Sequence, residues 1–157
     1  MNGPSWSTVI NPPDAPTQIA ALLNNNADVL LDRAYGRTWT AATINQAPLS
    51  DAACQAVFTV TFQEVVTAAL TSGWYTTVLC TGPVGGDGSL ALIQDQEMFS
   101  VVFLERDFKQ VLYTSAELRS ALEAYLIRRR WASWLAGTDG LLAQRTLPGV
   151  TEPLYAY

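Results

Sequence analysis

Charged side chains are scarce in this chain, and their scarcity limits the kind of surface that it can build. Asp, Glu, Lys and Arg make up 15% of the 157 residues, whereas apolar residues make up 49%. An ordinary soluble domain is about 25% charged. The surface must therefore consist largely of uncharged polar and apolar groups, or other subunits must cover part of it. We expect the second arrangement, in which copies of the chain shield one another from water.

The length suits one domain, and a chain of this size buries about 70% of the surface that it exposes when unfolded. We expect a single domain over residues 1–157, with a core at 14–137 and arms at 1–13 and 138–157. The net charge of −5 argues against coating nucleic acid by bulk attraction. No stretch reaches the roughly 18 apolar residues of a membrane span, so we expect no membrane partner.

Both arms combine prolines with large apolar side chains. Pro4, Pro12 and Pro13 interrupt regular structure around Trp6, while the C-terminal arm contains Pro148 and Pro153 beside several large apolar residues. Large apolar residues favour burial. Each arm is therefore expected to pack along its own domain or along a neighbouring subunit.

The first half of the core contains two helical patterns. Asp14 is a suitable N-cap for a helix over 15–33, although three consecutive asparagines leave two shorter helices as an alternative. Ser50 is a suitable N-cap for a helix over 50–72, although the segment FTVTF within it alternates as a strand does. Gly73 ends this pattern, and residues 74–81 are the clearest strand candidate.

The second half begins with the glycine-rich stretch 82–89, which predicts a loop. Residues 90–113 fit a helix better than a strand, although MFSVVFL alone would suit a strand. Thr114 and Glu117 form a capping-box pattern for a last helix that Gly137 ends. These patterns predict a mainly-α fold, an antiparallel bundle of about four helices with one or two short strands.

The composition excludes several chemistries. The chain has no histidine, so no Ser-His or Cys-His nucleophile system and no histidine zinc site can form within it. Cys54 and Cys80 have no CxxC spacing and are expected to be buried free thiols. Glu64 and Asp95 are the acids least unsuited to catalysis. We expect no enzyme activity, no catalytic residue, no cofactor and no metal.

The run RRRWASW is the sharpest feature of the sequence. Arg and Trp are enriched at the energetic centres of protein interfaces, which favours a subunit interface here. Two alternatives are internal structure at a helix end and contact with nucleic acid through phosphate pairing and base stacking. The candidate contact residues, taken with those of the arms, are Arg128, Arg129, Arg130, Trp131, Trp134, Trp6, Tyr155 and Tyr157.

In overall character the chain is similar to the coat subunits of rod-shaped plant viruses, which are also small, acidic and arm-bearing around a helical bundle. The likeness is one of composition. We expect a self-assembling structural subunit of a viral particle, a capsid or coat protein in a helical or ring assembly. It would be assembled in the host cytoplasm, with copies of itself as its partner and viral nucleic acid as a further candidate partner.

Two other readings remain open. One is a phage neck or tail protein, an adaptor or terminator that forms rings. The other is a small helical protein-binding module. A coat that wraps a genome would place several arginines on one lining, for which Arg33, Arg37 and Arg128–Arg130 are the candidates.

Overall fold

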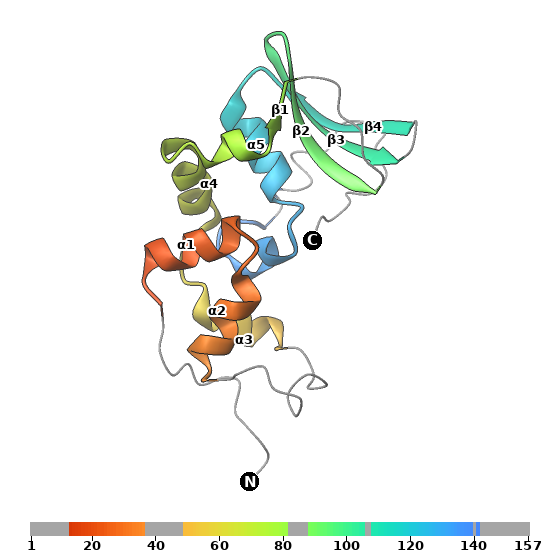
Figure 1. Ribbon diagram of the computed structural model, residues 1–157. Helices are drawn as coiled ribbons and strands as arrows, with labels where there is room; N and C mark the ends of the chain where they lie inside the picture. Colours follow the sequence, from red (N-terminus) through yellow and green to blue (C-terminus); the bar gives the residue numbers. More distant parts are fainter. Residues whose placement is uncertain (1–12, 37–48, 82–87, 106–107, 140, 142–157) are drawn as a thin grey trace. The chain divides into compact units, whose positions relative to one another are not determined.

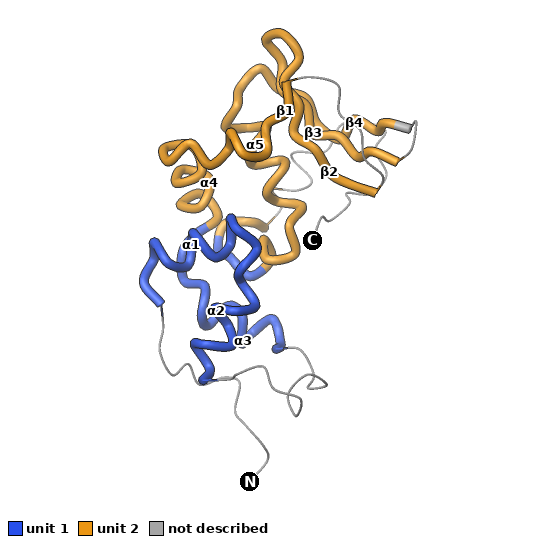
Figure 2. Tube along the Cα trace, in the orientation of Figure 1, with its two compact units in different colours: residues 1–61, 134–136 blue, residues 62–133, 137–157 orange. Residues whose placement is uncertain are grey.

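The computed structural model describes residues 13–36, 49–81, 88–105, 108–139 and 141, which fall into two compact units (Figure 2). Unit 1 contains the described residues up to Thr61 together with Trp134–Ala136. Unit 2 contains the described residues from Phe62 to Ser133 and those after Ala136. Unit 1 is helical, whereas unit 2 combines helices with a four-stranded sheet.

Unit 1 begins with two short helices, α1 (Ala15–Leu23) and α2 (Ala27–Ala34), joined by a turn of asparagines (Figure 1). The Asp14 carboxylate accepts a hydrogen bond from the backbone N–H of Thr17 at 2.9 Å, which satisfies one of the free N–H groups at the start of α1. The N-cap that the sequence predicts is therefore confirmed. So is the alternative of two shorter helices, because the asparagines end α1.

Helix α3 (Asp51–Val57) also starts at its predicted N-cap. The Ser50 hydroxyl accepts a hydrogen bond from the backbone N–H of Ala53 at 3.2 Å. On the other side, the phenol of Tyr35 donates to the carbonyl oxygen of Ala53 at 2.7 Å. The first turn of α3 is thus tied to the end of α2.

The single helix expected over 50–72 is wrong, because the chain leaves the helical path after α3. The backbone N–H groups of Thr59 and Val60 donate to Oε1 of Gln18, at 2.8 and 3.2 Å. In a continuing helix these two groups would donate to carbonyl oxygens four residues earlier. A side chain of α1 therefore supplies the acceptor that a longer α3 would have supplied.

Unit 2 contains a sheet in the strand order β1-β2-β3-β4. β1 pairs parallel with β2, and the remaining pairs are antiparallel. Helix α5 (Leu118–Leu126) lies between α4 (Phe62–Thr71) and the sheet in Figure 1, and it contacts α4, β2, β3 and β4. The strands are β1 (Leu79–Cys80), β2 (Ser89–Asp95), β3 (Met98–Glu105) and β4 (Phe108–Ser115).

The helix expected over 90–113 is wrong, because this segment forms β2, β3 and most of β4. Val101 and Val102 are neighbours on β3, so their side chains point to opposite faces of the sheet. Both are 0% exposed. A strand buried on both faces shows a continuous apolar run instead of an alternation, and periodicity alone does not separate such a run from a buried helix.

The strand expected over 74–81 forms only at its end, as β1. Residues Trp74–Thr77 form a 3-10 helix after Gly73, whose φ of +78° lies in the left-handed region. The hydroxyls of Thr76 and Thr77 donate to carbonyl oxygens three residues earlier, at 2.7 and 2.8 Å. These local hydrogen bonds compete with strand pairing, which explains the tight turn.

The last expected helix is shorter than its pattern, and its predicted capping box is wrong. Thr114 pairs with Ser100 inside the sheet and is not a helix cap. Glu117 occupies the N-cap of α5, and its backbone N–H donates to the Ser115 hydroxyl at 3.0 Å. β4 extends over the residues that the pattern assigns to the helix start.

The described residues therefore form an α/β fold, with five short helices and a mixed four-stranded sheet. The expected mainly-α antiparallel bundle is wrong, because one of its four helices is a set of strands. The predicted arms lie almost entirely outside the described residues.

Candidate functional site

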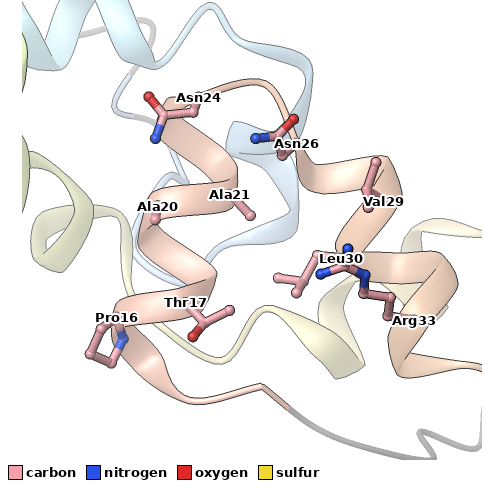
Figure 3. Close-up of a pocket in the computed structure, with 9 residues that line it drawn as sticks. All are labelled: Pro16, Thr17, Ala20, Ala21, Asn24, Asn26, Val29, Leu30 and Arg33. Atoms are coloured by element: carbon pink, nitrogen blue, oxygen red, sulfur yellow. The ribbon is translucent and has the colours of Figure 1, made fainter.

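A groove of about 560 Å³ lies between α1 and α2 of unit 1 (Figure 3). The two helices form its walls, and the asparagine turn lies at the end where they join. The groove is lined by Pro16, Thr17, Ala20 and Ala21 of α1, Asn24 and Asn26 of the turn, and Val29, Leu30 and Arg33 of α2. This is the candidate interaction site of the described residues.

The spacing of apolar residues on α2 explains why one valine faces water. The buried apolar residues of this helix recur at helical spacing: Ala27, Leu30, Leu31 and Ala34. Val29 lies off that stripe and is 45% exposed. In the described part of the chain, Met98 is the other large hydrophobic side chain exposed to a similar degree, at 41%.

The asparagine turn fixes how α1 and α2 meet. Asn25 has a φ of 59°, in the left-handed region that asparagine tolerates better than most residues. The backbone N–H of Asn26 then donates to the carbonyl oxygen of Ala21 at 2.8 Å. This is the long hydrogen bond of a Schellman motif, which closes α1 and directs the chain into α2.

The groove is almost free of charge. Arg33 is the one charged residue among the nine that line it, and no carboxylate or thiol is among them. The central part of a protein interface is depleted of charge yet enriched in arginine. The chemistry of the groove therefore suits binding of another protein surface.

Two buried polar side chains hold the α1–α2 pair against the rest of unit 1. Gln18 is 2% exposed, and its Nε2 donates to the Pro13 carbonyl oxygen at 3.0 Å and to the Thr59 hydroxyl at 3.1 Å. Tyr35 is also buried, and this burial raises the pKa of its phenol above the ordinary value of 10.0, with a smaller contribution from Cys54. Helices α1 and α2, which form the walls of the groove, are thus each bonded to the rest of unit 1.

The three consecutive arginines of the RRRWASW run lie in different environments. Arg128 is 0% exposed, and its Nη1 donates to the carbonyl oxygen of Ala124. Arg129 is half-buried, with its guanidinium 4.9 Å from the centroid of the Tyr125 ring and its Nη2 donating to the Tyr125 hydroxyl at 2.6 Å. Burial raises the pKa of the Tyr125 phenol, and Arg129 partly opposes that rise. Arg130 is exposed.

The two tryptophans of this run are buried. Trp131 belongs to unit 2, whereas Trp134 belongs to unit 1 and stacks on Phe58, with ring centroids 5.7 Å apart and an interplanar angle of 18°. Neither offers an exposed ring face on which a base could stack. The other three candidate contact residues, Trp6, Tyr155 and Tyr157, lie outside the described residues.

Sequence reasoning did not find the groove, although one signal was present. Arg33 was a candidate only for a nucleic-acid lining, and it lies in the groove, while Arg37 lies outside the described residues. The usable signal was Val29, an apolar residue that falls between the buried positions of its helix. A groove between two helices also depends on their crossing, which no single helix pattern specifies.

The remaining candidates for chemistry lie apart from the groove. Cys54 and Cys80 are free thiols, as predicted, with Cys80 only half-buried. Glu64 and Asp95 are exposed, on α4 and at the end of β2. Within the described ranges, no group of three or more His, Cys, Asp or Glu residues could hold a metal ion, and no helix is long and apolar enough to cross a membrane.

Comparison of the chain with protein-family models, with curated proteins and with solved structures gives no match.

Proposed function

We propose that this protein is a structural subunit that assembles with copies of itself in a viral particle, and that the α1–α2 groove is one of its contact surfaces. The observation that carries the proposal is the absence of charge on α1. Its sequence, APTQIAALL, contains no charged residue, yet Ala15, Pro16, Thr17 and Ala20 are exposed. A surface helix usually carries charged or polar residues on its outer face.

The composition of the chain supports a second copy as the occupant of this surface. Charged residues are scarce throughout the sequence, so one copy offers another a largely uncharged exterior. The groove adds exposed Val29 and a single arginine to the uncharged face of α1. Two such surfaces can come into contact while removing few charged groups from water. Burying an unpaired charge is the most costly form of polar burial.

The corrected fold bears on the form of the assembly. The comparison with rod-shaped coats depended on a helical bundle, and the described residues form an α/β fold instead. Shell-forming subunits and ring-forming neck or tail subunits do not depend on that bundle. Burial of Arg128 and of both tryptophans favours a structural part for the RRRWASW run over contact with a genome.

The experiment compares the size of the purified protein with the 17.1 kDa of one chain. Sedimentation velocity and negative-stain electron microscopy, on the protein alone, are expected to show rings, shells or other oligomers. A monomer at every concentration tested would contradict self-assembly. A monomer that binds a foreign protein through the groove would point to the protein-binding module instead.

Two matched pairs of substitutions test the groove itself. Ala20→Arg fills the groove wall with a charged side chain, whereas Ala52→Arg adds the same side chain at an exposed position of α3. Val29→Asp and Met98→Asp form the second pair, at the two exposed large hydrophobic residues of the described part. We expect Ala20→Arg and Val29→Asp to weaken assembly at least about tenfold, the effect of one lost interface hot spot. Equal effects within each pair would show that the groove is not the interface.

A further inference from the structure

Three consecutive residues belong to unit 1 although their neighbours on both sides belong to unit 2. They are Trp134–Ala136, which lie between Phe62–Ser133 and the residues from Gly137 onward. Trp134 and Leu135 are buried, at 7% and 4% exposed. We call Trp134–Ala136 the strap. It follows α5 and all four strands in the chain, yet it is part of the unit that the chain forms first.

The strap contacts both ends of residues 58–61, which lie between α3 and α4. At one end of this segment, Phe58 stacks on Trp134, with the ring centroids 5.7 Å apart. At the other end, Thr61 forms a parallel β-bridge with Ala136. Phe58 is itself 2% exposed, so the stacked rings belong to the core of unit 1.

The middle of the same segment is bonded to a wall of the groove. The backbone N–H groups of Thr59 and Val60 donate to Oε1 of Gln18, at 2.8 and 3.2 Å. Gln18 lies on α1 next to Thr17, which lines the groove, whereas Gln18 itself is buried behind that wall. Residues 58–61 therefore connect the groove helix α1 to the strap.

Helix α1 depends on such contacts for its order. It has nine residues, fewer than the roughly 12–15 at which an isolated helix becomes stable in water. If the strap left its place, Phe58 would lose its stacking partner and Thr61 its bridge. Because residues 58–61 form no helix, they would then be held less firmly, and so would α1 through Gln18.

A glycine directly after the strap allows the chain to turn back to unit 2. Gly137 has a φ of +89°, in the left-handed region, and a Cβ at this position would meet nothing within 4 Å. The backbone conformation, and not a lack of space, therefore favours glycine here. An alanine at this position would strain the docked strap without removing any of its contacts.

We propose that the strap is a conformational device that orders the groove, because α1 keeps its place in the groove wall only while the strap is docked on residues 58–61. Synthesis proceeds from the N-terminus, so α1 and α2 are made before Phe62–Ser133 and the strap after them. The groove is therefore completed only when the chain has been made through Ala136. A role in delaying assembly until then rests on the proposed function, whereas the dependence of α1 on the strap does not.

Two tryptophans three residues apart provide a matched test in the full-length protein. Trp134 of the strap and Trp131 of unit 2 are almost equally buried, at 7% and 6% exposed. We expect Trp134→Ala to accelerate hydrogen exchange of the α1 amides at least about tenfold and to leave the β2–β4 amides unchanged. Trp131→Ala should loosen unit 2 and leave α1 unchanged. Exchange of α1 at the wild-type rate in Trp134→Ala, or equally fast in both variants, would overturn the proposal.

A second pair of variants adds strain without removing a side chain. Gly137→Ala and Gly88→Ala each place a Cβ at positive φ, +89° and +67°, with nothing within 4 Å of it. We expect Gly137→Ala to accelerate α1 exchange about fivefold, the factor that corresponds to the strain of one left-handed residue. Gly88→Ala, directly before β2, should leave α1 exchange unchanged. If Trp134→Ala does not fold, this pair decides, and equal α1 exchange in its two members would contradict the proposal.

The route through Gln18 is tested by combining Gly137→Ala with substitutions on α1. Gln18→Ala removes the link to residues 58–61, so in this background Gly137→Ala should accelerate α1 exchange less than about twofold. Leu22→Ala is the control background, because it removes a buried side chain of α1 and leaves the link, so the effect of about fivefold should remain. Equal effects in the two backgrounds would show that the strap does not act through residues 58–61.

These results are independent of the outcome for self-assembly. Exchange is measured within each chain, so it reports on the strap even in a monomer. A protein that is monomeric at every concentration would contradict the proposed function, and the exchange of α1 in the strap variants would still decide this inference.

Discussion

The two units of this protein are stabilised in different ways. Unit 1 consists of helices of seven to nine residues, shorter than the roughly 12–15 residues at which isolated helices become stable in water. Its helices are joined by buried polar side chains that bond to backbone groups, Gln18 and Tyr35 above all. Unit 2 instead has a sheet buried on both faces, with α5 packed on one of them.

The polar contacts between α4 and α5 of unit 2 connect side chains to one another. Nη2 of Arg119 donates to Gln63 at 2.8 Å and to Thr67 at 3.0 Å, and Gln63 donates to Glu123 at 2.6 Å. These contacts link α5 to α4. Removing a hydrogen bond costs most where it leaves a buried backbone group without a partner. Unit 1 should therefore be sensitive to polar substitutions and unit 2 to apolar ones.

The largest effect on unit 1 is expected from Gln18→Ala. The substitution removes the acceptor of the Thr59 and Val60 N–H groups, and an unsatisfied buried group costs about 1–3 kcal/mol. We expect the free energy of unfolding of unit 1 to fall by about 3 kcal/mol. Hydrogen exchange of the backbone amides of α1–α3 measures this free energy. The control is Val29→Ala, at a position of α2 that is 45% exposed, where a change within about 0.5 kcal/mol is expected. A Gln18 effect as small as the control would show that the unit is not held by polar contacts.

The next largest effect is expected from substitutions on the two faces of β3, which should destabilise unit 2. Val101→Ala and Val102→Ala each remove two methyl groups from a fully buried side chain. Each should destabilise unit 2 by about 2 kcal/mol, between the values for the loss of one methyl and of a whole leucine side chain. Urea unfolding followed by exchange of the β3 amides measures both. Val29→Ala, at an exposed position, is the control.

The two valines need not respond alike, and the difference between them is informative. If Val101→Ala is costly and Val102→Ala is as mild as Val29→Ala, the face of the sheet that carries Val102 is open to water in solution. The core of the unit would then lie on the face of the sheet that carries Val101.

The contrast between the units also explains which features could be read from the sequence. The caps at Asp14 and Ser50 were predictable because an N-cap depends on one side chain and the next few residues. The end of α3 was not, because its cause is Gln18, some 41 residues away along the chain. The strands of unit 2 were missed because burial on both faces removes the alternation by which strands are recognised.

The candidate site also has some features that the sequence shows and others that depend on how the chain folds. The lack of charge that marks the groove is visible in APTQIAALL, and the position of Val29 off the buried stripe is visible too. The turn that brings the two helices together rests on the left-handed backbone of Asn25, which a run of three asparagines suggests but does not locate. For the RRRWASW run the sequence favoured a subunit interface and left internal structure as an alternative, because a contact such as that of Trp134 with Phe58 joins distant parts of the chain.

The smallest effect is expected from Tyr35→Phe. This substitution should change the pH dependence of the stability of unit 1 and leave that of unit 2 unchanged. The substitution removes the hydrogen bond to the Ala53 carbonyl and should cost unit 1 about 1 kcal/mol near neutral pH. Burial raises the pKa of Tyr35, so above about pH 10 the unfolded chain releases a proton that the folded state retains. The stability of unit 1 is therefore expected to fall as pH rises through this range, and to fall less steeply in Tyr35→Phe.

Unit 2 provides the comparison for that measurement. The pKa of Tyr125 is also raised by burial, so unit 2 should lose stability at alkaline pH as well, and Tyr35→Phe should leave that loss unchanged. Exchange of α1–α3 amides and of β2–β4 amides, followed from neutral pH to above pH 10, records the two units separately. If Tyr35→Phe altered both profiles equally, the two units would unfold as one cooperative body. The different stabilising contacts of the two units would then not make their stabilities independent.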